Sequence, residues 1–242
     1  MKILFDEKKV LITGGTRGIG KKIAQDFSKN GAKVTITGTN NIKPYWCKKI
    51  KYEKLHINKK NDWKKEINDI VNKYDGFDIL VNNVGINKVS KIYKIDYEDI
   101  SNILLTNLNA PIYIASLVSK KMIKKKYGYI VNIGSIFGVV TKEGRNCYSA
   151  SKAGLIGVTK TMAIDLGKFN ILVNTVSPGI VDTELTQKIL GKDGMLKMKK
   201  KIPLKKLASV SDISPYILFL ASEQNKYMTG QNIIVDGGYT LE

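Results

Sequence analysis

The residues best suited to chemistry are Tyr148 and Lys152, four positions apart at the start of a helical pattern that runs to about Lys168. On a helix, residues at this spacing share one face, with their Cβ atoms about 5 to 6 Å apart. A neighbouring ammonium favours the phenolate, so the pair could lower the pKa of a tyrosine from about 10 toward neutrality. Tyr148 is therefore a candidate general acid or base. Any helix can carry Tyr and Lys at this spacing, so the rest of the chain must decide whether the pair is catalytic or only part of a helix surface.

A glycine-rich turn near the start of the chain is the second candidate site. The β-branched run Lys9–Thr13 is followed by Gly14, Gly18 and Gly20 and by a helical pattern that stops at Gly31. A strand, a glycine turn and a helix in this order place backbone N–H groups and the positive helix end where a pyrophosphate binds. Tight turns also select glycine, but the strand-to-helix context favours a dinucleotide site.

Alternating strand and helix patterns continue along the chain and place these candidates in an α/β domain. Further strands are predicted at Lys33–Thr37, Leu55–Ile57, Asp78–Val81, Tyr129–Ile133, Ile171–Val176 and Asn232–Val235. Helices are predicted at Asn61–Tyr74, from Asp96 onward, at Tyr148–Lys168 and at Ser211–Ser222. The basic stretch 43–54 has no assigned structure, and the Lys-rich segment 183–207 has the length and position of a lid.

Composition narrows the classes of protein. The 242 residues, 43% of them hydrophobic, suit one α/β domain. No secretory signal or membrane span is predicted, and Cys47 and Cys147 form no metal or redox motif, so a cytoplasmic protein with free thiols and no metal is expected. The net charge of +19 includes only two arginines, Arg17 and Arg145, and the scattered lysines favour a solvated surface over a nucleic-acid site. The single histidine, His56, is interpreted as structural.

The residues after the second strand predict the cofactor. An acidic residue there would hold both ribose hydroxyls and repel a 2′-phosphate. This chain instead has Thr39, Asn40 and Asn41, with Lys43 nearby and Arg17 on the glycine turn. Hydroxyl, amide and cationic groups tolerate an anion. NADP(H) is therefore predicted in preference to NAD(H).

Polar residues near other predicted strand ends and in one helix add to the site. Asn83 and Gly85 follow the fourth strand, and Ser135 follows the fifth. In the helix that begins at Asp96, Pro111 lacks an N–H, so the carbonyl of Asn107 loses its usual partner and could bind water. A simple kink in a packed helix is the alternative.

Together these motifs resemble the short-chain dehydrogenase/reductase family over nearly the whole chain. The motifs are Thr13–Gly14, Gly18, Gly20, Asn82–Gly85, Asn107, Ser135, Tyr148, Lys152, Pro178–Gly179 and Asp236–Gly238. The resemblance implies a doubly wound Rossmann-type parallel β-sheet of about seven strands with helices on both faces, in a single domain. It also implies a homotetramer or homodimer.

The resemblance also implies the roles of individual residues. Tyr148 resembles the proton donor, Ser135 the residue that orients the carbonyl, Lys152 the group that binds the nicotinamide ribose, and Asn107 the residue whose main-chain carbonyl holds a water. The cofactor contacts implied are Gly14, Thr16, Arg17, Gly18, Ile19, Gly20, Thr39, Asn58, Asn83, Val84, Gly85, Tyr148, Lys152, Pro178, Gly179, Ile180 and Thr183. Val84 departs from the family pattern, which has alanine there.

The substrate implied is less specific. The nearest general resemblance is to 3-oxoacyl-carrier-protein reductases, in which Lys126 falls at a basic residue that docks the acidic carrier, although Phe169 replaces a second one. The loop Ile86–Val89 is equally similar to that of sugar and polyol dehydrogenases. A non-catalytic NADP(H) sensor or scaffold is the alternative of another class. The lysines of the lid could receive an acidic partner or form a solvated face.

Overall fold

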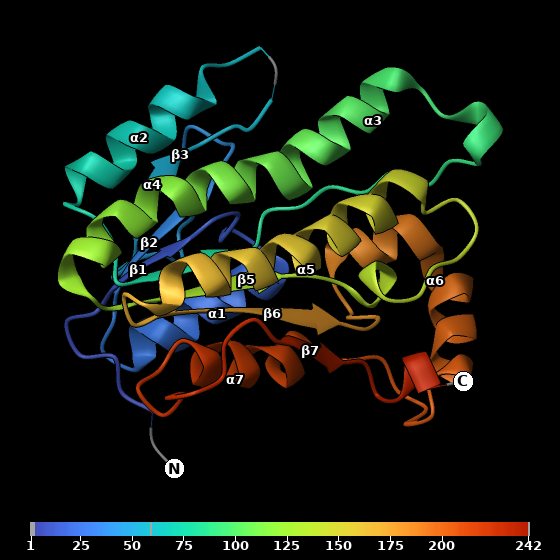
Figure 1. The fold of residues 1–242 in the computed structure, drawn as a ribbon. Coiled ribbons are helices and arrows are strands. Elements are labelled where there is room, and N and C mark those ends of the chain that lie inside the picture. Colours follow the sequence, from blue (N-terminus) through green and yellow to red (C-terminus); the bar gives the residue numbers. More distant parts are fainter. Residues whose placement is uncertain (1–2, 59, 242) are drawn as a thin grey trace.

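Seven parallel strands form one sheet in the order β3-β2-β1-β4-β5-β6-β7 (Figure 1). The computed structural model describes residues 3–58 and 60–241. The strands are β1 (Lys9–Ile12), β2 (Lys33–Gly38), β3 (Lys51–Lys54), β4 (Ile79–Asn82), β5 (Gly128–Ile133), β6 (Ile171–Pro178) and β7 (Asn232–Val235). Because β1 pairs with both β2 and β4, the strand order reverses beside β1. This reversal is the switch point at which open α/β sheets bind ligands, and the doubly wound fold is confirmed.

Helices cover both faces of this sheet (Figure 1). One face carries α1 (Gly18–Lys29) and α7 (Val210–Leu220), and the other carries α2 (Trp63–Lys73), α4 (Ala110–Lys125) and α5 (Asn146–Gly167). The chain reaches α4 through α3 (Tyr97–Leu104) and the π-helical η2 (Leu105–Asn109), and α6 (Glu184–Lys201) follows β6. Short 3₁₀ turns are η1 (Ile92–Lys94), η3 (Ile136–Gly138) and η4 (Tyr239–Leu241). No helix within the described residues is both long and apolar enough to cross a membrane.

Alternate strand residues face two separate hydrophobic layers. Val10 and Ile12 of β1 pack in the layer that contains α1 and α7, whereas Leu11 packs in the layer that contains α2 and α4. All three side chains are fully buried. A parallel sheet covered on both faces requires apolar residues at successive positions, which is why these strands read as continuous hydrophobic runs.

The third strand lies earlier than the sequence predicts. We expected it at Leu55–Ile57, but β3 occupies Lys51–Lys54 within the stretch that had no assigned structure. β3 is an edge strand whose residues are exposed or half-buried, so it lacks the hydrophobic signal of the central strands. Leu55 and Ile57 are buried because they pack in the layer with α2, and not as members of the strand.

The predicted helix starts agree with the structure to within a residue or two. Asp96 precedes α3 and is its N-cap, because its side chain accepts a hydrogen bond from the Glu98 N–H. α7 begins at Val210 because Ser209 and Asp212 form a reciprocal capping box.

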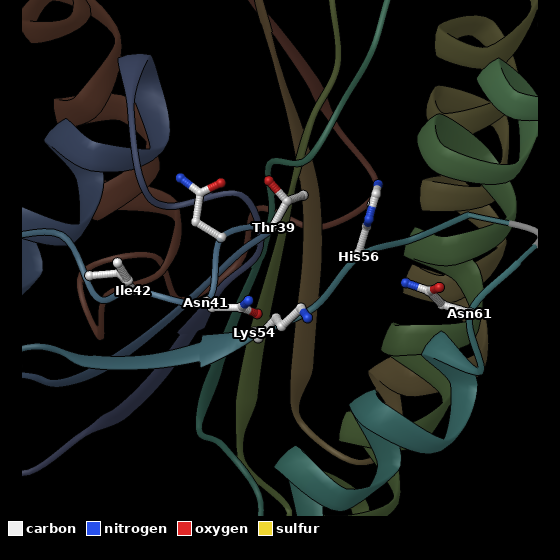
Figure 2. Close-up of a pocket in the computed structure, with 7 residues that line it drawn as sticks. Thr39, Asn41, Ile42, Lys54, His56 and Asn61 are labelled. Atoms are coloured by element: carbon white, nitrogen blue, oxygen red, sulfur yellow. The ribbon is translucent and has the colours of Figure 1, made fainter.

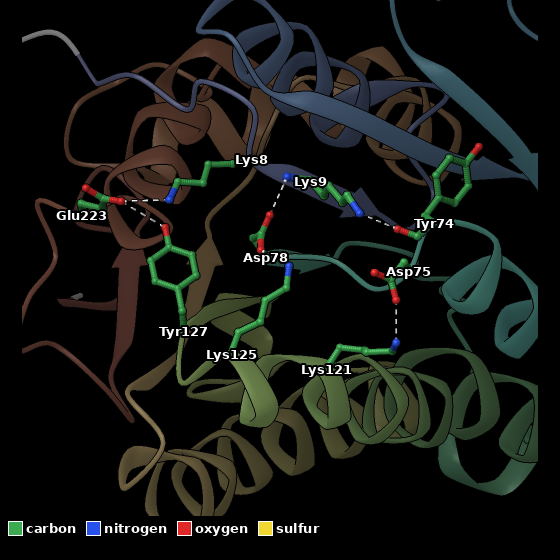
Figure 3. A network of polar contacts seen from close by, with 9 residues as sticks. All are labelled: Lys8, Lys9, Tyr74, Asp75, Asp78, Lys121, Lys125, Tyr127 and Glu223. Atoms are coloured by element: carbon green, nitrogen blue, oxygen red, sulfur yellow. Dashed lines mark hydrogen bonds and ion pairs between the residues drawn. The ribbon is translucent and has the colours of Figure 1, made fainter.

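An amino-edge network, at the end of the sheet where β1, β4 and β5 begin, joins these strands to their neighbours (Figure 3). Asp78 accepts hydrogen bonds from the Lys9 N–H and the Lys125 ammonium, each at 2.9 Å. Beside it, Lys121 pairs with Asp75 at 2.6 Å. The Asp78 side chain is only 13% exposed, so its two bonds are shielded from water, whereas that of Asp75 is 76% exposed.

We expect Asp78→Asn to lower the free energy of unfolding by about 1 to 3 kcal/mol, because the amide cannot accept from both donors. Urea unfolding measures the change, with the exposed Asp75→Asn as matched control. Equal effects of the two substitutions would show that the bonds of Asp78 do not hold the amino edge.

Candidate active site

Most of the predicted site residues lie on loops at the carboxyl edge of the sheet. The glycine turn follows β1, Asn83–Gly85 follow β4, Ser135 follows β5, and Gly179 follows β6. Because the strands are parallel, all these loops meet at one edge, beside the switch point between β1 and β4.

The glycine turn leaves the start of α1 open. Gly14 and Gly18 have φ values of +64° and +53°, which other residues rarely adopt. Arg17 is the N-cap, but its side chain caps no N–H, and the first turn of α1 contains no acidic residue. The first N–H groups of α1 therefore have no side-chain acceptor, an arrangement that fits a bound phosphate group.

Hydrogen bonds tie this turn to the loop after β4. Asn83 Nδ2 donates to the carbonyls of Thr13 and Gly14 at 3.0 and 2.9 Å. The Thr13 hydroxyl accepts from the N–H groups of Asn83 and Val84 at 3.0 and 3.2 Å. A Cβ on Gly20 would lie 2.4 Å from Asn83 Nδ2, so only glycine permits this approach. Asn83 and Val84 are thus fixed against the glycine turn.

The loop after β6 closes the other side of the glycine turn. Thr183, the N-cap of α6, lies 3.7 Å through its methyl group from the position that a Cβ on Gly18 would occupy. Gly179 donates its N–H to the Val235 carbonyl at 2.9 Å. Pro178 ends β6, and Ile180 is buried against other apolar side chains. Of these predicted contacts, Thr183 is the one that the structure places against the glycine turn.

A pocket of about 470 Å³ lies beyond the carboxyl end of β2 (Figure 2). Figure 2 shows Lys54 and Thr39 near its centre, with His56 and Asn61 on the opposite side from Asn41. The lining contains no carboxylate; its residues are Thr39, Asn40, Asn41, Ile42, Lys54, His56 and Asn61. This composition suits an anionic group, as the sequence predicts for the 2′-phosphate.

The pocket also corrects some predictions. His56, interpreted as structural, is exposed and lines the pocket, and Lys54 lines it in place of the expected Lys43. Both residues were missed because the third strand was predicted too late in the chain. With β3 at Lys51–Lys54, Lys54 ends the strand and His56 follows it at the carboxyl edge of the sheet.

The remaining cofactor predictions fall outside the pocket lining. Asn58 accepts from the N–H groups of Lys60 and Asn61, so its side-chain oxygen shapes the turn that carries Asn61. Arg17 is exposed and lies 4.0 Å from Glu184. Thr16 packs against Gly38, and Ile19 packs on the core.

Asn107 lies in a π-helical turn, not at a simple kink. Ala110 donates its N–H to the Leu105 carbonyl, five residues back, and Pro111 follows. The buried Asn107 side chain accepts from the Ile86 N–H at 2.8 Å and donates to the Ile86 carbonyl at 2.9 Å. It also donates to Ser151 Oγ at 3.2 Å. The π turn therefore joins the loop after β4 to α5 through a side chain.

Lys152 projects from α5 into the carboxyl edge. Its side chain is buried, and its ammonium donates to the Ile133 carbonyl at 2.7 Å. A Cβ on Gly85 would lie 3.7 Å from this ammonium and 3.5 Å from Asn107 Oδ1, so Gly85 leaves space beside both. Burial lowers the pKa of Lys152 to about 8.

The structure brings Tyr148, Ser135 and Lys152 together, with a different electrostatic balance from the one expected. The Lys152 ammonium lies 5.8 Å from the centre of the Tyr148 ring. Burial raises the pKa of Tyr148 above its usual value, and a hydrogen bond with Ser135 and the charge of Arg145 only partly oppose this. The sequence predicted that Lys152 would lower this pKa. The direction in this structure is the opposite, because burial outweighs the groups that lower the pKa, and Lys152 is not among those groups.

One residue beside this group, Arg145, was not predicted to belong to the site. Arg145 is 5% exposed, and its guanidinium lies 5.1 Å from the centre of the Phe137 ring. The sequence signal was available, since Arg145 is one of two arginines among 40 basic residues and precedes Tyr148 by three positions.

α6 packs on the same apolar cluster as Tyr148. Leu190 and Met198 of α6 pack, together with Tyr148, on the cluster of Phe137 and Ile180. Within the helix, Gly191 has a φ of +63° and interrupts the helical backbone. None of the residues of α6 is fully buried.

Comparison with known proteins agrees with this architecture. A family model described as enoyl-(acyl-carrier-protein) reductase matches residues 14–240. The chain is 36% identical over 247 residues to the 3-oxoacyl-(acyl-carrier-protein) reductase FabG of Aquifex aeolicus, covering 98% of this chain and 99% of that protein. It is 34% identical to the FabG of Chlamydia pneumoniae, covering 99% and 100%.

Solved structures with similar folds include sugar and sugar-acid enzymes. A gluconate 5-dehydrogenase from Burkholderia cenocepacia, in complex with NADP and tartrate, superposes with a TM-score of 0.92 at 26% identity and covers 100% of this chain and 98% of its own. The aldohexose dehydrogenase of Thermoplasma acidophilum gives a TM-score of 0.90 at 26% identity, covering 98% and 95%.

The buried Lys152 should make stability depend on pH. Its folded pKa of about 8 lies below the usual 10.5, so between these values the unfolded chain binds more protons and stability rises with pH. From pH 7 to 9.5 we expect wild type to gain about 2 kcal/mol of unfolding free energy relative to Lys152→Met. Urea unfolding at both pH values measures this gain. An identical pH response in the two proteins would contradict the lowered pKa.

Proposed function

We propose that this chain, which belongs to the short-chain dehydrogenase/reductase family, is an NADP(H)-dependent reductase of ketones with Tyr148 as its proton donor. The family acts on CH–OH and C=O groups with a nicotinamide cofactor. The observation that carries the proposal is that Tyr148 lies beside both Ser135 and the buried Lys152, whose ammonium is 5.8 Å from the centre of the Tyr148 ring.

The residues present fit a dinucleotide. The uncapped N-terminus of α1 at Gly18–Gly20 would hold the pyrophosphate, and the pocket at Thr39 and Lys54 would hold the adenosine ribose and its 2′-phosphate. Asn83–Gly85, Lys152 and Thr183 would line the remainder. When bound, the cofactor supplies the hydride.

Ser135 and Tyr148 act on the substrate oxygen. Both hydroxyls can donate hydrogen bonds to the oxygen on which negative charge develops, and Tyr148 Oη then gives up its proton. A tyrosine is already protonated at neutral pH with its usual pKa near 10, and burial raises the pKa of Tyr148 further, which makes the phenol a poor base. A group that stays protonated suits donation to a carbonyl, so we propose that reduction is the favoured direction.

Lys152 and Asn107 serve the return of the proton. With a pKa of about 8, the Lys152 ammonium can lose and regain a proton near neutral pH. The side chain of Asn107 is committed to Ile86 and Ser151, so its proposed role in holding a water belongs to its main-chain carbonyl, for which Pro111 provides no N–H.

A 3-oxoacyl thioester is the first substrate candidate, supported by the identity to two FabG enzymes. If an acidic carrier docks on Lys126, the substrate that it carries can reach Tyr148 only in a second copy of the chain. Lys126 ends α4 beside β5, at the amino edge of the sheet, and its carbonyl accepts from Asn170. Tyr148 lies at the opposite edge, so a carrier docked on Lys126 would serve the site of a neighbouring copy in an oligomer.

An oxidoreductase of sugars or their acids is the second candidate. Its support is the structural similarity to gluconate and aldohexose dehydrogenases and the presence of a buried arginine beside Tyr148.

We expect Tyr148→Phe to lower kcat by a factor on the order of 10² to 10⁴, because it removes the proton donor and keeps the ring. NADPH binding, measured by fluorescence titration, should be nearly unchanged. Tyr216→Phe, on the partly exposed face of α7, is the matched control and should keep full activity. Retained turnover in Tyr148→Phe would exclude the proposed proton donor.

We expect Lys54→Ala to raise the KM for NADPH on the order of tenfold and to leave the KM for NADH unchanged, because only NADPH carries the 2′-phosphate. Steady-state kinetics with both cofactors measure the effect, and Arg17→Ala tests the other cation in the same way. Lys51→Ala, exposed on the same strand and outside the pocket, is the control. Equal losses with both cofactors would argue against a 2′-phosphate site.

A further inference from the structure

Arg145 is a buried cation that lacks an anionic partner among the described residues. Its side chain is 5% exposed, and its Nε has no hydrogen-bond partner. None of the ion pairs formed between described residues includes it. An uncompensated buried charge costs several kcal/mol, and such a cost is retained where the charge has a use.

Arg145 stands at the reaction site. It is the N-cap of α5, three positions before Tyr148, and the Ser149 N–H donates to its carbonyl at 2.7 Å. Its guanidinium lies 5.1 Å from the centre of the Phe137 ring, and the Phe137 N–H donates to Ser135 Oγ at 3.1 Å. Arg145 therefore lies beside both residues that act on the substrate oxygen.

The charged neighbour of the guanidinium, Lys142, is also positive, and the other groups that act on it are the phenols of Tyr148 and Tyr239. Lys142 lies 5.8 Å from the centre of the same Phe137 ring. Burial lowers the pKa of Lys142, and the charges of Arg145 and Lys201 of α6 lower it further. An anion that enters beside Arg145 and Lys142 relieves the repulsion between these two cations.

We propose that Arg145 binds a carboxylate of the substrate, so that the chain reduces oxo acids whose carboxyl group lies within a few bonds of the reacting carbonyl. The inference rests on the proposed reduction at Tyr148. A guanidinium binds a carboxylate through two parallel hydrogen bonds, and Arg145 is close enough to Tyr148 for its charge to act on the phenol. A thioester carbonyl in the same place is neutral and leaves the charge of Arg145 uncompensated.

Acetoacetate and methyl acetoacetate form a matched pair of test substrates, because they share the reacting carbonyl and differ by one negative charge. With NADPH, we expect wild type to show a kcat/KM at least about tenfold higher for the acid. Arg145→Gln keeps N–H donors and removes the charge. It should lower kcat/KM for the acid by about 10- to 100-fold and leave the ester nearly unaffected. Retained ester activity also shows that this variant folds.

Lys192→Gln, on the exposed side of α6, is the control for a general loss of positive charge and should keep the preference for the acid. If wild type uses the ester as well as the acid, or if Arg145→Gln lowers both equally, the carboxylate site is excluded while the proposed reduction stands.

Binding provides a readout that does not need turnover. Calorimetric titration of acetoacetate into protein saturated with NADP⁺ should give a Kd that rises at least about tenfold in Arg145→Gln. If neither substrate is reduced, the proposed reduction of these ketones fails, and the titration still decides the carboxylate site. No difference in binding between wild type and Arg145→Gln would overturn it.

Discussion

The hydrogen bond from the Lys152 ammonium to the Ile133 carbonyl is the contact on which the arrangement of the site depends. It joins the central helix α5 to the last residue of β5, and so it sets α5 against the carboxyl edge of the sheet. Tyr148 lies one turn before Lys152, and Ser135 lies two residues beyond Ile133. This buried bond therefore contributes to placing the phenol beside the serine hydroxyl.

The parallel sheet supplies the rest of the geometry. Its strands end at one edge, so loops that are far apart in sequence converge beside the switch point. Two side chains then hold these loops in place: Asn83 binds the glycine turn, and Asn107 binds both the loop after β4 and α5. The result is that Ser135, Tyr148 and Lys152 lie at the same edge of the sheet as the glycine turn.

The sequence could predict much of this arrangement because its signals are local. The glycine turn, the Tyr148 and Lys152 pair and the central strands each follow from spacing and hydrophobic pattern within a few residues. The position of β3 did not follow, because a polar edge strand carries no such pattern, and the pocket residues Lys54 and His56 were missed with it. The raised pKa of Tyr148 and the burial of Arg145 depend on packing between segments, which spacing alone does not report.

The central claim is that burial raises the pKa of Tyr148, so that the phenol serves as a proton donor to a carbonyl and not as a base. Carbon-13 NMR of tyrosine labelled at Cζ, with the Tyr148 signal assigned from Tyr148→Phe, measures this pKa directly. We predict that the Tyr148 signal titrates above the usual value of 10 in the free protein. Titration near neutral pH would contradict the account and restore the simpler picture of a phenolate stabilised by Lys152.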